Sequence, residues 1–222
     1  MKVESCLKAV LIDLDGTLVD SLPMIYKIYL KFLKAYGFEG SKEKFAALNG
    51  PRLQEVMLIL KEEYGISDPV DSLVDKYSTE TLKVYESVSM FPGAREFLEF
   101  AQRNGLKLAL VTAAPRLAVN VFLDKHGLEN IFSVIVTGDE VERAKPDPLI
   151  YIKALELLHL SSEDVLTIED SPNGAQASVE AFIPTVFMTH GNSELELEGA
   201  KVIPVKNWKA MLSFLEERLL HD

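Results

Sequence analysis

Short apolar runs recur along the chain, and helical patterns separate them. The first run, Ala9-Val10-Leu11-Ile12, is apolar at every position, as expected for a parallel strand that is buried on both faces. Four more runs of this kind follow at Leu108–Val111, Val134–Val136, Val165–Ile168 and Thr185–Phe187. Helical patterns lie at Ala94–Asn104, Leu117–His126, Leu149–Leu158 and Ala175–Ala181. This alternation predicts an α/β fold with a parallel sheet.

The stretch from about residue 22 to residue 88 interrupts the alternation. Ser21 and Pro23 are typical of a helix start, and apolar residues follow them at helical spacing. Further helical patterns run through Leu53–Tyr64 and Leu73–Tyr85, and no run in this stretch clearly indicates a strand. We therefore predict an α/β core formed by residues 1–21 and 89–222, and an inserted helical cap formed by residues 22–88.

Composition argues against several classes of partner. The 222 residues carry a formal net charge of -11, whereas proteins that bind nucleic acid hold its phosphates with a surplus of Lys and Arg. No segment reaches the roughly 20 apolar residues that a membrane span needs. We expect neither a nucleic-acid nor a membrane partner, and we take the cytoplasm as the default compartment. The oligomeric state stays open.

Two aspartates follow the first apolar run directly, in Asp13-Leu14-Asp15-Gly16-Thr17. Open α/β sheets place their ligands at the carboxyl ends of the strands. The alternative is an acidic turn, because Asp and Gly are common in loops. From average composition, the chance of this pattern anywhere in such a chain is roughly one in several hundred. The segment therefore indicates a ligand site.

Two weaker signals follow the second and third runs. Thr112 and Ala113 could offer a hydroxyl and backbone N–H groups to a phosphate oxygen, although most threonines at strand ends only form turns. Lys145 is followed by Pro146 and Pro148, which stiffen the backbone. A fixed ammonium near two aspartates would neutralise a phosphoryl group, and the alternative is an ordinary solvated lysine.

Glu169 and Asp170 leave the fourth apolar run together. Paired carboxylates at a buried strand end are costly unless positive charge lies near them, and a hard divalent cation would supply it. The alternative is an acidic start of the next helix, and both roles can coexist.

Taken together, these four segments follow four successive predicted strands, so one cleft could receive all of them. The constellation resembles the haloacid-dehalogenase-like superfamily, whose four motifs match Asp13-Leu14-Asp15-Gly16-Thr17, Thr112, Lys145-Pro146 and Glu169-Asp170. The resemblance spans nearly the whole chain and includes a helical cap in the place of this family's C1-type caps. It implies a Rossmann-like core and a Mg²⁺-dependent phosphatase that acts on a small phosphorylated metabolite, either a sugar phosphate or a phosphoglycolate-like acid.

The resemblance also implies residue roles. Asp13 would attack phosphorus and form an aspartyl-phosphate, and Asp15 would serve as general acid and then as general base. Thr112, the Ala113 N–H group and Lys145 would bind the phosphoryl oxygens.

Mg²⁺ is the implied cofactor. Its ligands would be the Asp13 carboxylate, the Asp15 backbone carbonyl and Asp170, with Glu169 either a direct ligand or a support for the others.

A phosphosugar mutase related to β-phosphoglucomutase is the nearest alternative within the family. Leu48-Asn49-Gly50-Pro51-Arg52 resembles the cap loop in which mutases hold a distal phosphate, so Arg52 is either a substrate ligand or a surface arginine. The mutases carry a histidine in the first cap helix, and Ile25 stands at that place here. This difference favours hydrolysis. An alternative of another class is a non-catalytic protein that binds phosphorylated ligands, although such a protein has no need of Asp15.

Two departures from the family pattern concern single positions. Ala113 and Ala114 replace the more frequent serine or asparagine, so backbone contacts alone remain there. Phe182 stands where many relatives have glycine, and we expect it to alter the end of the preceding helix.

Overall fold

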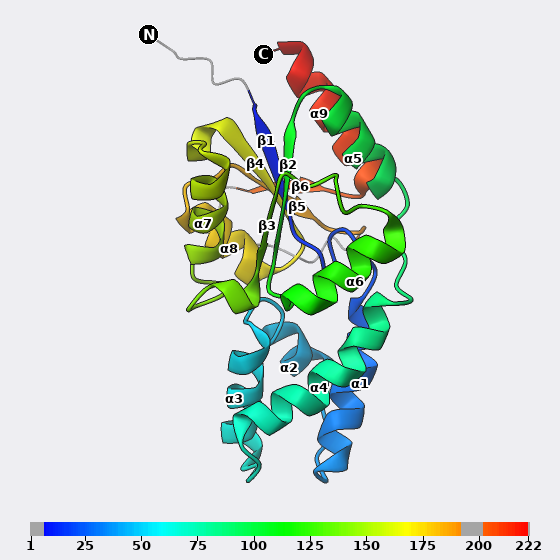
Figure 1. The fold of residues 1–222 in the computed structure, drawn as a ribbon, viewed down its shortest axis with the longest axis vertical. Helices are drawn as coiled ribbons and strands as arrows, with labels where there is room; N and C mark the ends of the chain where they lie inside the picture. Colours follow the sequence, from blue (N-terminus) through cyan, green and yellow to red (C-terminus); the bar gives the residue numbers. More distant parts are fainter. Residues whose placement is uncertain (1–6, 192–201, 222) are drawn as a thin grey trace.

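A single parallel sheet forms the centre of the molecule. The computed structural model describes residues 7–191 and 202–221 (Figure 1). In these ranges six strands pair in the order β3-β2-β1-β4-β5-β6, and every neighbouring pair is parallel. The strands are β1 (Ala9–Ile12), β2 (Lys107–Thr112), β3 (Val134–Thr137), β4 (Val165–Glu169), β5 (Thr185–Met188) and β6 (Val202–Val205). The predicted α/β fold with a Rossmann-like parallel sheet is confirmed.

Helices cover both faces of this sheet. They are α5 (Ala94–Arg103), α6 (Arg116–His126), α7 (Leu149–Leu158), α8 (Pro172–Glu180) and α9 (Trp208–His221), with short 3-10 turns at Gly138–Glu140 and Ser162–Asp164. Val10 and Ile12 of β1 pack in one hydrophobic cluster with α5, α6 and α9, whereas Ala9 and Leu11 pack in another with α7 and α8 (Figure 1). Successive strand side chains point to opposite faces, so both faces require apolar residues and the run is continuously apolar.

Four helices lie between β1 and α5 in the sequence and gather at one end of the molecule (Figure 1). They are α1 (Leu22–Ala35), α2 (Lys42–Ala47), α3 (Leu53–Tyr64) and α4 (Val70–Tyr85). Tyr29 and Leu33 of α1 pack with Met57 of α3 and Leu73 of α4, which gives these helices a hydrophobic cluster of their own. We call α1–α4 the helical module. The boundaries of the core and the cap stay a prediction.

The strand order brings the carboxyl ends of β1 and β4 together. From β1 the chain adds β2 and β3 on one side, and then returns to add β4, β5 and β6 on the other side. A ligand crevice in such a sheet lies where the order reverses, at the carboxyl ends of the strands. The helical module lies at this end of the sheet (Figure 1).

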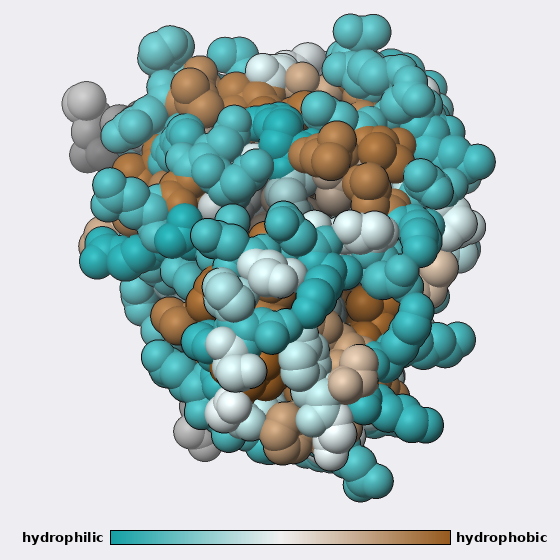
Figure 2. All heavy atoms as spheres, turned by 60° about the horizontal axis from the view of Figure 1, so that its bottom comes forward, coloured by the Kyte–Doolittle hydropathy of each residue, from teal (hydrophilic) through white to brown (hydrophobic). Residues whose placement is uncertain are grey.

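The surface over the outer end of the helical module is mostly hydrophilic, with apolar side chains gathered in small patches (Figure 2). Among the described residues, no helix is both long enough and apolar enough to cross a membrane.

Candidate active site

The loop after β1 reaches the end of β4. The Asp13 backbone N–H donates to the Ile168 carbonyl oxygen at 3.1 Å, which continues the pairing of the two strands by one step. Gly16 then turns the chain with a φ of +85°. A Cβ at Gly16 would lie 2.2 Å from Asp170 Oδ2, so glycine lets the two acidic loops meet.

The Lys145 ammonium joins the ends of three strands. It is 2% exposed and donates to Asp13 Oδ1 after β1, to Glu169 Oε1 at the end of β4, and to the Val111 carbonyl oxygen of β2 at 3.1 Å. Lys145 is therefore a fixed, buried cation, and the alternative of a solvated lysine is excluded.

Glu169 is fully buried and accepts hydrogen bonds on both oxygens. Besides Lys145, the Tyr151 hydroxyl donates to Oε1 at 2.6 Å, and the Ser171 hydroxyl donates to Oε2 at 3.2 Å. Gly174 leaves room for this carboxylate, because a Cβ there would lie 2.0 Å from Oε1. Glu169 thus holds Lys145 in place.

Asp15 receives hydrogen bonds from the residue that precedes α1 and from the last residue of α4. The Ser21 hydroxyl donates to Oδ1, and the Tyr85 hydroxyl, from the end of α4, donates to Oδ2 at 2.7 Å. Asp170 is held by the Thr17 hydroxyl, which donates to Oδ1 at 2.8 Å.

Burial shifts the protonation equilibria of these groups. It raises the pKa of Asp13 to about 8, against the attraction of Lys145, and it raises the pKa values of Asp15 and Asp170 as well. Burial disfavours the Lys145 ammonium too, but the carboxylates of Asp13 and Glu169 more than offset this, so the pKa of Lys145 lies above its usual value. Burial therefore favours the neutral, protonated forms of the Asp13, Asp15 and Asp170 carboxyl groups in the absence of a further cation.

The donor set suits a hard divalent cation. Asp13, Glu169 and Asp170 each place a carboxylate oxygen so that all three atoms lie within 4.8 Å of one another. Oxygen ligands are those that Mg²⁺ prefers, and its charge would stabilise the ionised form of carboxylates that burial disfavours.

Thr112 and Ala113 lie where β2 ends. Thr112 is buried, and its Oγ1 accepts the Ala114 N–H at 3.1 Å, which shapes the turn. A Cβ at Gly138, after β3, would lie 2.3 Å from the Ala113 carbonyl oxygen, so this loop also packs tightly.

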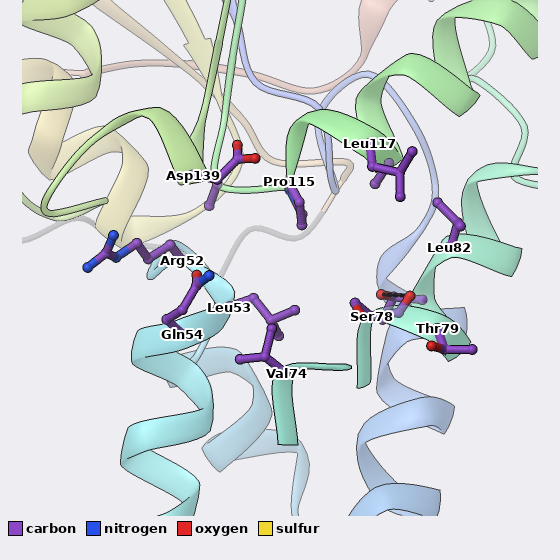
Figure 3. Close-up of a pocket in the computed structure, with 13 residues that line it drawn as sticks. Arg52, Leu53, Gln54, Val74, Ser78, Thr79, Leu82, Pro115, Leu117 and Asp139 are labelled. Carbon is purple, nitrogen blue, oxygen red and sulfur yellow. Dashed lines mark hydrogen bonds between the residues drawn. The ribbon is translucent and has the colours of Figure 1, made fainter. Parts of the chain in front are cut away.

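Two cavities lie between the core and the helical module. The smaller, of about 120 Å³, is lined by Asp15, Ile25, Tyr85 and Ala113 among others. The larger, of about 280 Å³, also reaches Ala113 and extends between α3, α4 and the start of α6 (Figure 3). A molecule that contacts Asp15 can therefore extend into the helical module.

Arg52 lies at the start of α3 and borders the larger cavity. Its Nη1 donates to the Val141 carbonyl oxygen at 3.1 Å, and its Nε lies 3.6 Å from Glu55 Oε1. Figure 3 shows the guanidinium directed away from Leu53 and Val74. The structure does not bring Arg52 together with the acidic residues, and its role in substrate binding stays a prediction.

Three residues that donate hydrogen bonds to the acidic groups were not predicted from the sequence as site residues: Ser21, Tyr85 and Tyr151. Ser21 was noted only as a helix start. Tyr85 lies 70 residues from Asp15 in the chain, and Tyr151 lies 18 residues from Glu169. Both tyrosines occupy helices at positions that core packing alone would explain, so no local pattern indicates them.

Comparisons with known proteins agree with this architecture. Residues 10–188 match the haloacid dehalogenase-like hydrolase family. The chain is 33% identical over 217 residues to the phosphorylated carbohydrates phosphatase of Thermotoga maritima, across 96% of this chain and 100% of that protein. It is 28% identical over 191 residues to a phosphoglycolate phosphatase of Pseudomonas fluorescens, across 83% of this chain and 70% of that protein.

The fold is shared with solved structures. The β-phosphoglucomutase of Clostridium difficile superposes with a TM-score of 0.85 at 20% identity, across 97% of this chain and 98% of that one. CbbY of Rhodobacter sphaeroides, solved with phosphate, gives 0.80 at 23% identity, across 91% and 95% of the two chains. At these identities the likeness concerns the fold alone.

The chain belongs to the haloacid dehalogenase-like hydrolase family. The family prediction is confirmed. The predicted enzyme class, a phosphoric monoester hydrolase, is confirmed by the family match and by these phosphatase relatives.

Proposed function

We propose that this enzyme is a Mg²⁺-dependent phosphatase that hydrolyses a small phosphorylated metabolite through an aspartyl-phosphate on Asp13. The observation that carries the proposal is the contact of the buried Lys145 ammonium with Asp13 and Glu169 at the ends of β1 and β4. A cation fixed beside a nucleophilic carboxylate suits phosphoryl transfer, which depends on positioning and charge stabilisation.

The reaction divides into two displacements at phosphorus. In the first, an Asp13 oxygen bonds to phosphorus, the bond from phosphorus to the alcohol oxygen breaks, and Asp15 gives that oxygen its proton. In the second, Asp15 takes a proton from water as the water oxygen attacks phosphorus, and the bond to Asp13 breaks. Asp15 is suited to both steps because it lines the cavity beside Ala113.

The phosphoryl oxygens would be bound by Lys145, the Thr112 hydroxyl and the Ala113 N–H group. Thr112 and Ala113 lie at the end of β2. The Lys145 ammonium lies close to them, because it contacts the Val111 carbonyl oxygen of the same strand as well as Asp13 after β1. This arrangement supports the role.

Mg²⁺ would be held by the Asp13 carboxylate, the Asp15 backbone carbonyl and Asp170. When bound, it would offset the negative charge of the phosphoryl group. Glu169 already accepts hydrogen bonds on both oxygens, which favours a supporting role over direct ligation.

The helical module, which lies within the predicted cap of residues 22–88, would enclose the alcohol part of the substrate. The names of the relatives support a phosphorylated carbohydrate or phosphoglycolate as the kind of substrate. Ile25 lines the cavity that contains Asp15, so an apolar side chain stands there in place of the mutase histidine. We therefore prefer hydrolysis to phosphosugar isomerisation.

Phosphate release from a panel of phosphorylated metabolites tests the proposal. We expect release with Mg²⁺, none after chelation, and a loss of at least about 1,000-fold in Asp13→Asn, because the nucleophile is removed. Asp124→Asn makes the same chemical change at an exposed position of α6 and should keep full activity. A folded protein that releases no phosphate would instead support the phospho-ligand-binding alternative, and isomerisation of a phosphosugar with a bisphosphate activator would support the mutase.

A further inference from the structure

Backbone hydrogen bonds fold the loop after β1 into a compact turn. The Leu14 carbonyl oxygen accepts the N–H groups of Leu18 and Val19 at 2.9 and 3.0 Å. The Val19 carbonyl oxygen in turn accepts the Gly16 N–H at 3.0 Å. Phe91, on the segment that returns from the helical module to the core, donates its N–H to the Leu18 carbonyl oxygen at 3.0 Å. Three carbonyl groups of this loop therefore have backbone partners.

Two ring N–H groups from distant parts of the chain hold two more carbonyl oxygens of the loop. His190, the second residue after β5, places its Nε2 2.6 Å from the Gly16 carbonyl oxygen. A carbonyl oxygen can only accept, so this nitrogen carries the proton and donates. Trp208, at the start of α9, donates its Nε1–H to the Thr17 carbonyl oxygen at 3.0 Å.

The Asp15 carbonyl group differs from its neighbours in the loop. From Leu14 to Val19 every other carbonyl oxygen accepts a hydrogen bond, whereas that of Asp15 accepts none from any residue that the structure describes. A backbone oxygen without a hydrogen-bond partner suits a hard cation, and the Asp15 carbonyl is a proposed Mg²⁺ ligand. The bonds at Gly16 and Thr17 thus fix the peptide groups that follow this ligand.

His190 is itself held by the segment that returns from the helical module. Its ring stacks on that of Phe91, with the centroids 4.1 Å apart and the planes 21° apart. Its φ is +49°, which is uncommon for a residue other than glycine and points to a specific role for this side chain. His190 is exposed at the surface, so its substitution should leave the fold intact.

We infer that His190 is a positioning residue for the magnesium site: its hydrogen bond to the Gly16 carbonyl oxygen keeps the Asp15 carbonyl group oriented toward the cation. Without this bond the peptide group after Gly16 would be free to rotate. Because glycine has wide conformational freedom, that rotation would also change the direction of the Asp15 carbonyl group. The inference rests on the proposed function and adds to it a residue from outside the four motifs.

Titration calorimetry with Mg²⁺ alone tests this role on the full chain. His190→Phe keeps a ring that can stack on Phe91 but removes the donor, so the dissociation constant for Mg²⁺ should rise about threefold to tenfold. His190→Gln keeps an N–H donor and should stay within about twofold of the wild type. An unchanged constant in His190→Phe, or an equal rise in both variants, would overturn the inference.

His126 provides a matched control outside the acidic loop. Its Nε2 donates to the Val88 carbonyl oxygen at 3.0 Å, and its ring lies beside that of Phe122, with the centroids 4.8 Å apart. His126→Phe therefore removes the same kind of bond and should leave the dissociation constant for Mg²⁺ unchanged. A rise equal to that of His190→Phe would assign the effect to the attachment of the helical module and contradict the inference. Urea unfolding without Mg²⁺ checks that each variant is folded.

Phosphate release at several Mg²⁺ concentrations gives a second readout. In His190→Phe the Mg²⁺ concentration for half-maximal activity should rise about threefold to tenfold, whereas kcat at saturating Mg²⁺ should recover most of its wild-type value. A lower kcat with no change in the Mg²⁺ requirement would overturn the inference and leave the phosphatase proposal intact. A wild type that neither binds Mg²⁺ nor releases phosphate would overturn both.

Discussion

At the scale of single residues, the hydrogen bond from Tyr85 of α4 to Asp15 connects the helical module to the proposed general acid and base. Tyr85 is 3% exposed, so water is a poor substitute for its hydroxyl at Asp15. A hydrogen bond to a charged group contributes about 1.5–3 kcal/mol. We therefore expect Tyr85→Phe to lower kcat/KM for an alkyl phosphate by at least about tenfold.

A comparison of an aryl phosphate with an alkyl phosphate distinguishes a positioning role of Tyr85 from a purely structural one. p-Nitrophenyl phosphate has a leaving group that needs little help from an acid, so its kcat/KM should fall less than that of an alkyl phosphate. Tyr77→Phe removes the hydroxyl of another buried tyrosine of α4 that lines the same cavity, and it should change neither value by much. An equal decrease for both substrates in Tyr85→Phe would argue against positioning of Asp15.

Gly16 and Gly37 provide a matched pair for the close approach of the acidic loops. Both have a left-handed φ, of +85° and +83°, but a Cβ at Gly37 would meet nothing within 4 Å. Alanine at either position should cost about 1–2 kcal/mol of stability from the backbone conformation. Gly16→Ala should also displace Asp170 and abolish phosphate release, whereas Gly37→Ala should stay active. Urea unfolding and activity assays measure both effects, and an active Gly16→Ala variant would contradict this account.

At the scale of elements, Phe182 lies just after α8, at the position where many relatives have glycine. Its φ is +60°, a conformation that glycine adopts without a penalty, and its side chain is 85% exposed. Phe182→Gly should therefore raise the free energy of unfolding by about 1 kcal/mol. Phe182→Ala removes the ring but keeps the Cβ, so it should have little effect. Equal stabilisation by both substitutions in urea unfolding would assign the effect to the ring.

Helices were predicted correctly where the periodic pattern was long and missed where it was short. The predicted helices Leu53–Tyr64 and Leu149–Leu158 agree with α3 and α7. Helix α2 has six residues and was not predicted, because it is too short for a periodic pattern. Strand β6 was missed as well: it contains Pro204, which a sheet tolerates there because β6 is an edge strand.

Site residues at strand ends could be predicted from the sequence, whereas their partners on helices could not. Asp13 and Asp170 directly follow β1 and β4, and Thr112 and Glu169 are the last residues of β2 and β4. The parallel sheet alone therefore predicts that they meet. The partners Tyr85 and Tyr151 come from helices, and their contacts depend on tertiary packing that no local pattern encodes. The surroundings of Arg52 could not be predicted for the same reason.

At the scale of the whole molecule, a cation that binds the acidic cluster should stabilise the fold. Mg²⁺ binds the folded chain alone if its ligands converge only there, and at 100 times the dissociation constant this stabilises by about 2.7 kcal/mol. We expect Mg²⁺ to raise the Tm of the wild type and to raise that of Asp170→Asn much less. An equal rise in both proteins would place the cation elsewhere.

Chemical trapping of the phosphorylated enzyme tests the proposed reaction at its nucleophile. The enzyme is quenched during turnover of a phosphorylated substrate and treated with borohydride, which reduces an aspartyl-phosphate to homoserine. Peptide mass spectrometry should then find homoserine at residue 13 in the wild type and no such product in Asp13→Asn. Phosphate release by a wild type that is modified at a different residue, or at none, would contradict covalent catalysis by Asp13.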